Sequence, residues 1–231
     1  MSSWLYPRYA VIPTTGRACL YECLEAVQPQ VDKVFLIWAP QELGQEIKED
    51  AANLVVEMFM PDEKRNISRW WNVGIDAARQ HARDEMDAKQ WDVIVINDDA
   101  ILGPDWVEYV SHHMRQMKVA AASTGPVGLP VLHTRPNTTA LHQRMAGFAF
   151  MLAGELGVRA DETMYWWCGD NDIDMQSRLK GGTIVLPERR HGSTMIRHLF
   201  PDQSTMGEQA ARTAIDMERF VAKWGFRPWN L

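Results

Sequence analysis

Short apolar runs alternate with amphipathic stretches along most of this chain of 231 residues, and this alternation restricts the fold more than any other feature. Five runs have the length and the β-branched or aromatic content of strands. They cover residues 8–13, 33–38, 54–59, 91–96 and 183–186. Segments with the character of helices lie between them, at residues 18–26, 41–50 and 66–86. Strands that alternate with helices predict an α/β fold, with a mostly parallel central sheet flanked by helices.

The second half of the chain is less regular. Residues 125–142 contain three prolines and two histidines without periodicity, which predicts a long loop. Residues 145–153 are apolar and are expected to form a buried strand, and residues 172–179 are expected to begin a helix. The pattern predicts a C-terminal amphipathic helix over residues 207–224. Its apolar face is predicted to carry Ala210, Ala214, Met217 and Val221.

Composition narrows the possible classes of function. Apolar residues make up 46% and charged residues 23%, which is ordinary for a globular protein. The formal net charge of −6 provides no basic field that would draw the protein to nucleic acid. Three cysteines do not make a disulfide framework, and no apolar run approaches the roughly 20 residues that cross a bilayer. We expect a protein without a membrane span, in the cytoplasm or, if it is viral, in the host cytoplasm.

The first of two acidic clusters is Asn97-Asp98-Asp99, which directly follows the apolar run 91–96. In sheets of this kind, ligands bind beyond the carboxyl ends of the strands. Carboxylates at that position can hold a hard divalent cation, with phosphate and water completing its coordination. A simple turn is the alternative, because Asn and Asp favour turns. However, two adjacent carboxylates repel each other unless something neutralises them.

The second acidic cluster reads Gly-Asp-Asn-Asp-Ile-Asp over residues 169–174 and leads into a helix. Acidic residues at the start of a helix are favoured by its dipole, but three carboxylates within five residues exceed that need. Asp174 is expected to pair with Arg178 four residues later. Asp170 and Asp172 then remain to face a cleft, where a carboxylate can act as a general base.

Several other side chains are candidate functional residues, although each could instead have a purely structural role. Trp166 and Trp167 precede the second acidic cluster and are expected either to stack on a sugar or other flat acceptor or to pack in the core. Ten tryptophans in the chain fit both interpretations. His191 follows the last predicted strand as a possible metal ligand, although a lone histidine is more often structural. We rank His198 below it.

Five motifs in the same order resemble the family 2 glycosyltransferases of the GT-A fold. They are PTTGR, SRWWNVGID, VIVINDDA, the long segment AGFAFMLAGELGVRADETMYWWCGDNDIDMQSRL, and LPERRHGS. In that family a small polar turn follows the first strand, an Asn-x-Gly helix comes later, and an Asp-containing metal motif follows the fourth strand. The resemblance covers about residues 8–195. It implies a single GT-A (Rossmann-like) domain over residues 1–231, with a nucleotide-sugar-binding half to about 124 and an acceptor-binding, catalytic half from about 125.

The resemblance also implies a metal-dependent, inverting transfer of a sugar from a nucleoside-diphosphate sugar to a hydroxyl of a glycan, a protein or a modified nucleic acid. It assigns Asp99 and His191 to a Mn²⁺ or Mg²⁺ ion. It places Asp172 as the catalytic base, with Asp170 as a rival. Its implied donor contacts are Thr14, Thr15, Arg17, Arg69, Asn72 and Asp98.

The chain departs from the family at two places. Trp38-Ala39-Pro40-Gln41 stands where many members hold the nucleoside, and Asn171 replaces a glutamate.

Two other functions compete with that of a glycosyltransferase. A sugar nucleotidyltransferase would need a glycine-rich basic loop after the first strand, where residues 14–17 contain only one glycine. A non-catalytic carbohydrate-binding protein would use the tryptophans but would not need two acidic clusters.

Overall fold

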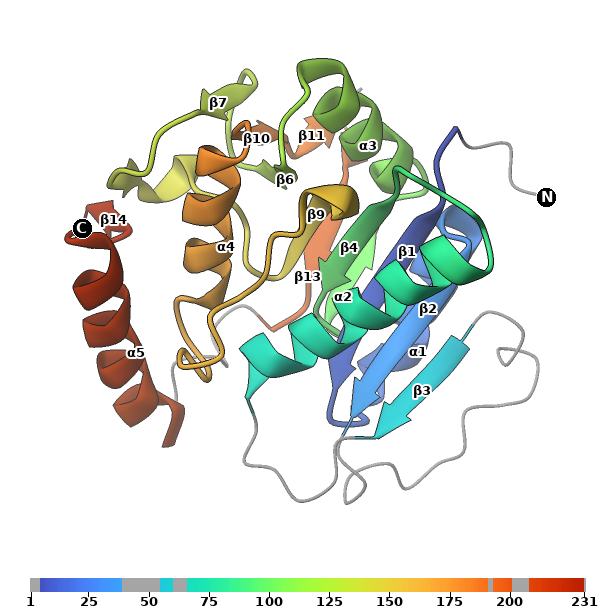
Figure 1. The fold of residues 1–231 in the computed structure, drawn as a ribbon, viewed down its shortest axis with the longest axis horizontal. Coiled ribbons are helices and arrows are strands. Elements are labelled where there is room, and N and C mark those ends of the chain that lie inside the picture. Colours follow the sequence, from blue (N-terminus) through green and yellow to red (C-terminus); the bar gives the residue numbers. More distant parts are fainter. Residues whose placement is uncertain (1–4, 39–54, 60–65, 191–192, 201–207, 231) are drawn as a thin grey trace.

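An eight-stranded sheet forms the centre of the molecule, in the order β3-β2-β1-β4-β9-β6-β10-β7 (Figure 1). The computed structural model describes residues 5–38, 55–59, 66–190, 193–200 and 208–230. The strands of the sheet are β1 (Arg8–Thr14), β2 (Lys33–Trp38), β3 (Val55–Phe59), β4 (Asp92–Ile96), β6 (Ala121–Gly125), β7 (Val131–His133), β9 (Ala149–Ala153) and β10 (Thr183–Pro187). All run in one direction except β7 and β9, so the sheet is mostly parallel.

Helices cover both faces of the sheet (Figure 1). They are α1 (Cys19–Val27), α2 (Ile67–Asp84), α3 (Trp106–Met117) and α4 (Gly169–Leu179). The last helix, α5 (Glu208–Trp224), packs against α4 on the side away from the sheet. Alternate residues of β1 face opposite layers: Ala10 and Ile12 pack with α1 and α3, whereas Tyr9 and Val11 pack with α2. Strand β1 is therefore apolar on both faces, as a central parallel strand must be.

Short strands complete the fold outside the main sheet. They are β5 (Ala100–Leu102), β8 (Thr139–Ala140), β11 (Arg189–Arg190), β12 (Ser193–Thr194), β13 (Ile196–His198) and β14 (Trp229–Asn230). Strand β13 pairs with β5, and β14 pairs with β8. These pairings connect the end of the described chain to segments far earlier in the sequence.

Most predicted elements are confirmed, to within four residues at their ends. The predicted helix at residues 41–50 lies outside the described residues. The prediction of a long loop over 125–142 is wrong in part, because β7 pairs with β10 and β8 pairs with β14 inside it. Helix α3 and strand β6 were not predicted. The sequence of β6, AASTG, has small side chains and low strand propensity, so only its position between β9 and β10 makes it a strand.

The buried face of α5 differs from the predicted one. Ala214 is exposed, whereas Asp216 and Phe220 are buried. The reason is a polar contact: Asp216 Oδ2 accepts the backbone N–H groups of Trp166 and Trp167, at 2.8 and 2.9 Å. The inward-facing carboxylate of Asp216 thus satisfies two backbone N–H groups of a loop. The spacing of apolar residues along α5 does not reveal such a contact.

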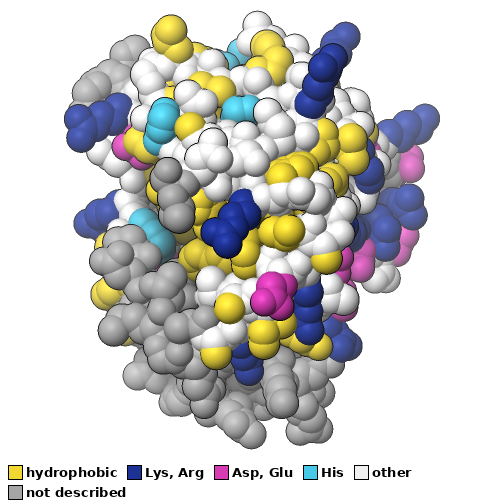
Figure 2. Space-filling view, turned by 90° about the vertical axis from the view of Figure 1, so that its left-hand side faces the viewer, with side chains coloured by type: hydrophobic (Ala, Val, Ile, Leu, Met, Phe, Trp, Pro, Cys, Tyr) yellow, Lys and Arg dark blue, Asp and Glu magenta, His cyan; other side chains and the backbone are white. Residues whose placement is uncertain are grey.

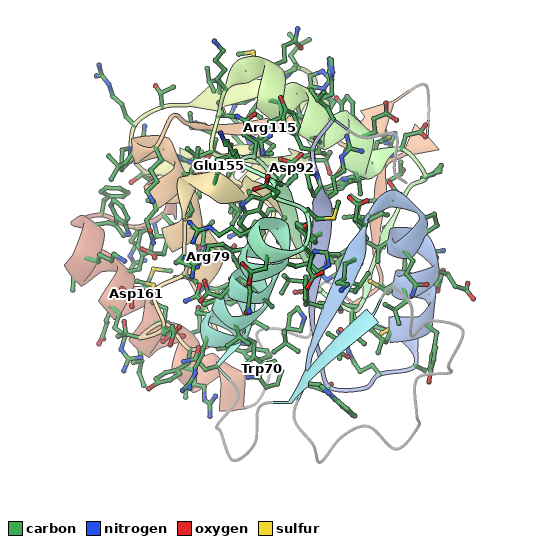
Figure 3. All side chains as sticks on the ribbon, turned by 45° about the vertical axis from the view of Figure 1, so that its right-hand side comes forward. Trp70, Arg79, Asp92, Arg115, Glu155 and Asp161 are labelled. Atoms are coloured by element: carbon green, nitrogen blue, oxygen red, sulfur yellow. The ribbon has the colours of Figure 1, made fainter. Side chains whose placement is uncertain are left out.

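An ionic cluster lies at the amino end of β4, far from its carboxyl end (Figure 3). Arg115 pairs with Asp92 at 2.6 Å, pairs with Glu155, and donates a hydrogen bond to the carbonyl oxygen of Trp91 at 2.7 Å. The carboxylate of Asp92 is fully buried, so its charge needs these partners. We interpret this cluster as structural.

Two further observations concern membrane-spanning helices and the cysteines. Within the described ranges, no helix is both long enough and apolar enough to cross a membrane. Cys19, Cys23 and Cys168 are free thiols.

Helix α2 lies directly on β1 because position 74 has no side chain. A Cβ at Gly74 would lie 2.8 Å from Cγ2 of Val11 and closer still to Cγ1. We predict that Gly74→Ala lowers the free energy of unfolding by about 1–3 kcal/mol, the usual cost of overpacking, as measured by urea denaturation. Gly128→Ala is the matched control, because a Cβ there has no atom within 4 Å. Equal stability of the two variants would contradict the close packing described here.

Candidate active site at the carboxyl edge of the sheet

Segments from three strands meet at the carboxyl edge of the central sheet. Strands β1, β2 and β4 run parallel and end at this edge, where Thr14 lies beside Trp38. Strand β9 runs the other way and begins there, with Ala149 beside Ile96. The residues that follow β1 and β4 and those that precede β9 therefore lie together.

Asp98 and Asp99 are the acidic centre of this edge. Thr14 Oγ1 donates a hydrogen bond to Asp98 Oδ2 at 2.7 Å. The guanidinium of Arg17 donates to Asp98 through Nε, at 3.3 Å, and through a terminal nitrogen. The same terminal nitrogen lies 3.1 Å from Asp99 Oδ2. The structure thus brings together four of the predicted residues, and the half-buried Thr15 lies next to them in the chain.

The charges of this cluster support one another. Burial by itself would raise the pKa of Asp99, but the contacts with His198 and Arg17 outweigh burial and hold it below its usual range. Burial disfavours the charge on Arg17, yet its pairing with Asp98 and Asp99 raises its pKa above the ordinary value. Both carboxyls are only 5% exposed.

His198 is the histidine that the described structure places in this cluster. Its Nε2 lies 3.3 Å from Asp99 Oδ1, and its ring stacks on Phe148 with the centroids 4.4 Å apart. The pairing of β13 with β5 sets His198 beside Ala100. His191, which we ranked higher from the sequence, lies outside the described residues. The position of His198 depends on pairing between distant strands, so no local pattern identifies it.

The donor set of Asp99 and His198 fits a divalent cation. Among the described residues, Asp99 Oδ1 accepts no hydrogen bond of good geometry and has His198 Nε2 as its nearest charged partner. A carboxylate oxygen and an imidazole nitrogen are suitable ligands for Mn²⁺, and Mg²⁺ accepts oxygen ligands. No group of three or more His, Cys, Asp or Glu side chains able to hold a metal occurs in the described part of the chain. Phosphate oxygens and water would have to complete the coordination.

Asp170 lies next to this edge. Its carboxylate packs against the backbone of Gly147, where a Cβ would collide with it. The next residue, Phe148, accepts a hydrogen bond from the backbone N–H of Asn97 at 2.9 Å and stacks on His198. The two acidic clusters therefore flank the dipeptide Gly147-Phe148. Burial raises the pKa of Asp170, and the positive charge of Arg144 opposes that rise.

Asp172 does not occupy the position of a catalytic base. It is fully buried and accepts hydrogen bonds from the backbone of Asp161 (3.1 Å), from Gln176 (2.6 Å) and from the indole of Trp224 (2.9 Å). The ammonium of Lys223 lies 2.8 Å from the same carboxylate. These contacts use both oxygens to hold α5 against α4. Of the two rivals predicted from the sequence, only Asp170 faces the candidate site.

The other pair in this cluster is confirmed. Arg178 binds Asp174 at 2.7 Å, and both side chains are buried. The guanidinium also donates to the side chains of Asn137 (2.7 Å) and Thr139 (2.9 Å). This ion pair therefore anchors the segment before β8 to helix α4.

Asn72 has a structural role where the resemblance implies a donor contact. Its amide donates to the carbonyl of Ala160 and to Glu162 and accepts the N–H of Ala160, at 2.9–3.0 Å. Ser68 holds the same loop through the carbonyl of Met164, at 2.6 Å. Arg69, between them, is exposed on the first turn of α2.

Trp166 and Trp167 are both half-buried. Their backbones are held by Asp216, and the ring of Trp167 packs edge-on against Trp229. The guanidinium of Arg144 lies over the Trp229 ring, 4.8 Å from its centroid. Figure 2 views the molecule from the side of α5 and β14, and apolar side chains form a broken band across this face with cationic groups among them.

Comparisons with known proteins support the fold. No protein-family model matches the sequence, and no curated protein matches it. The crystal structure of S. aureus TarS 1-349 is similar with a TM-score of 0.57 at 12% identity, over 95% of this chain and 72% of that one. The TarS complex with UDP gives the same values. The complex with UDP-GlcNAc gives a TM-score of 0.53 at 11% identity, over 96% and 73%. The predicted α/β fold of the GT-A type, with its mostly parallel sheet, is confirmed.

The contacts of Asp172 predict a loss of stability on substitution. In Asp172→Asn, the new amide nitrogen is a hydrogen-bond donor that faces other donors, and the negative charge opposite Lys223 is lost. We expect the free energy of unfolding to fall by about 2 kcal/mol or more, measured by chemical denaturation. Asp76→Asn, an exposed carboxylate on α2, is the control and should be close to neutral. Unchanged stability of Asp172→Asn would contradict this structural role and make Asp172 a candidate catalytic base again.

Proposed function

We propose that this chain is a metal-dependent, inverting glycosyltransferase, which moves a sugar from a nucleoside-diphosphate sugar to an acceptor hydroxyl. One observation carries the proposal: a carboxylate pair bound by an arginine, a histidine and a separate half-buried carboxylate flank the same dipeptide at the carboxyl edge of the sheet. Ligands bind at this edge in folds of this kind. The similar TarS structures were solved with UDP and with UDP-GlcNAc, which agrees with a donor of this class.

The donor half of the proposed site is formed by residues that follow β1 and β4. Asp99 and His198, with Asp98 beside them, would hold Mn²⁺ or Mg²⁺. When bound, the cation supplies charge neutralisation for a departing diphosphate. Thr15 and Arg17, at the same edge, are proposed to contact the phosphates, and Arg69 is proposed as a further donor contact. Asn72 is left out because its amide is already occupied.

Asp170 is the proposed general base. It would take the proton from the acceptor hydroxyl while that oxygen forms a bond to the anomeric carbon. The bond from the anomeric carbon to the diphosphate breaks at the same time, and its electron pair leaves with the nucleoside diphosphate. Because attack and departure occur on opposite faces, the anomeric configuration inverts. The half-buried rings of Trp166 and Trp167, which precede Asp170 in the chain, are proposed to support a sugar-bearing or other flat acceptor.

The proposal predicts which product is released and which residues are required. Incubation with a panel of nucleotide sugars and Mn²⁺ should release nucleoside diphosphate, measured by chromatography. Asp99→Asn and Asp170→Asn should each lower kcat/KM by about 100-fold or more, because the cation ligand or the base is lost. The control Asp76→Asn should retain full activity. Release of pyrophosphate would indicate a nucleotidyltransferase instead, and full turnover by both site variants would refute the assignment.

The environment of Asp170 predicts an acidic limb in the pH dependence. The base must be ionised, and burial raises its pKa, so kcat/KM should fall as the pH drops through a value above the usual aspartate range of about 3.9. Arg144→Gln should move that midpoint further upward, because the positive charge of Arg144 favours the carboxylate. Initial rates from pH 4 to 9 measure both effects. An acidic limb that persists unchanged in the residual activity of Asp170→Asn would assign it to another group.

A further inference from the structure

Arg17 occupies the position that a cation shared by Asp98 and Asp99 would take. Its guanidinium contacts both carboxylates at once: Nε and a terminal nitrogen bind Asp98, and that terminal nitrogen also reaches Asp99. A planar fork of N–H donors matches two carboxylates well, so this contact is both charged and directional. The two carboxyls are 5% exposed and the Arg17 side chain is 33% exposed.

Three of the four oxygens of the acidic pair are already in use, and the fourth, Asp99 Oδ1, lies 3.3 Å from Nε2 of His198. Thr14 and Arg17 occupy those of Asp98, while Arg17 and His198 contact the two oxygens of Asp99. A divalent cation drawing on both carboxylates would meet the guanidinium at van der Waals distance. Like charges in a partly buried site repel strongly. The guanidinium and the cation therefore exclude each other at this position.

Charge balance indicates where the displaced guanidinium goes. With Arg17 alone, the acidic pair keeps one negative charge in excess, and a diphosphate entering beside it is repelled. With a divalent cation on the pair, the carboxylates are balanced, and an arginine released next to them meets the incoming diphosphate with opposite charge.

We propose that Arg17 is a built-in counter-ion of the Asp98–Asp99 pair, that a divalent cation displaces it, and that the released guanidinium then binds the diphosphate of the donor. Displacement by the cation is independent of the proposed function, whereas the second step rests on it. Binding of cation and donor is thereby coupled: each removes an obstacle to the other. The ring of Phe200 lies beside this position, with its centroid 5.7 Å from the guanidinium carbon of Arg17.

Titration of Mn²⁺ alone, in the absence of nucleotide, tests the displacement. Calorimetry should give a dissociation constant for Arg17→Gln at least about 5-fold lower than for the wild type, since the competing charge is gone. Arg17→Lys should give an intermediate value, because one ammonium cannot span two carboxylates as a fork does. Arg79→Gln, an exposed arginine on α2, is the matched control and should bind Mn²⁺ as the wild type does (Figure 3).

A second titration in the presence of UDP tests the release. UDP should tighten Mn²⁺ binding in the wild type and should do so less in Arg17→Gln, because the group that joins the two ligands is missing. Equal or weaker Mn²⁺ binding by both Arg17 variants, or no binding by any protein, overturns the displacement. Tighter Mn²⁺ binding by Arg17→Gln with an equal effect of UDP on the wild type and on the variant would retain the counter-ion role and overturn the donor step, whereas the proposed function is tested separately by the release of nucleoside diphosphate.

Discussion

The need to neutralise two adjacent carboxylates at the end of a buried strand governs the arrangement of this molecule. Asp98 and Asp99 follow β4 at the carboxyl edge of the sheet and are almost inaccessible to water. Their partners come from distant parts of the chain: Arg17 after β1 and His198 in β13. The sheet order and the pairing of β13 with β5 make these contacts possible. Such a cluster costs stability through desolvation, so its presence at this edge points to a requirement other than folding.

The second acidic cluster shows how similar residues acquire different roles within one turn of helix. Asp172 and Asp174 point into packed regions, where Lys223, Trp224 and Arg178 bind them. Asp170 precedes them and rests against a glycine backbone instead. The two structural carboxylates fasten α4 to the last helix and to the segment before β8. They thereby fix the start of α4, on which Asp170 sits.

The sequence indicated the strands, most of the helices and both acidic clusters, because these depend on local patterns of apolar and charged residues. The Asp174–Arg178 pair was predictable for the same reason, since its spacing along one helix determines the contact. The role of Asn72 and the burial of Asp172 were not, because they arise from a loop and a helix 88 and 52 residues away. The position of His198 beside Asp99 was not predictable for a related reason: the pairing of two three-residue strands places it, and such short strands leave almost no trace in composition.

The reversed direction of β9 determines how the chain reaches the carboxyl edge of the sheet. In a wholly parallel sheet, every chain segment at the carboxyl edge is on its way out of a strand and into a helix. Here the chain reaches that edge before it enters β9, after a stretch of irregular structure anchored by Arg178 and β14. That stretch can lengthen, shorten or change sequence without shifting the register of β1 and β4. Under the function proposed above, the segment that would bind the acceptor could diverge while the residues that would hold the donor stay constant.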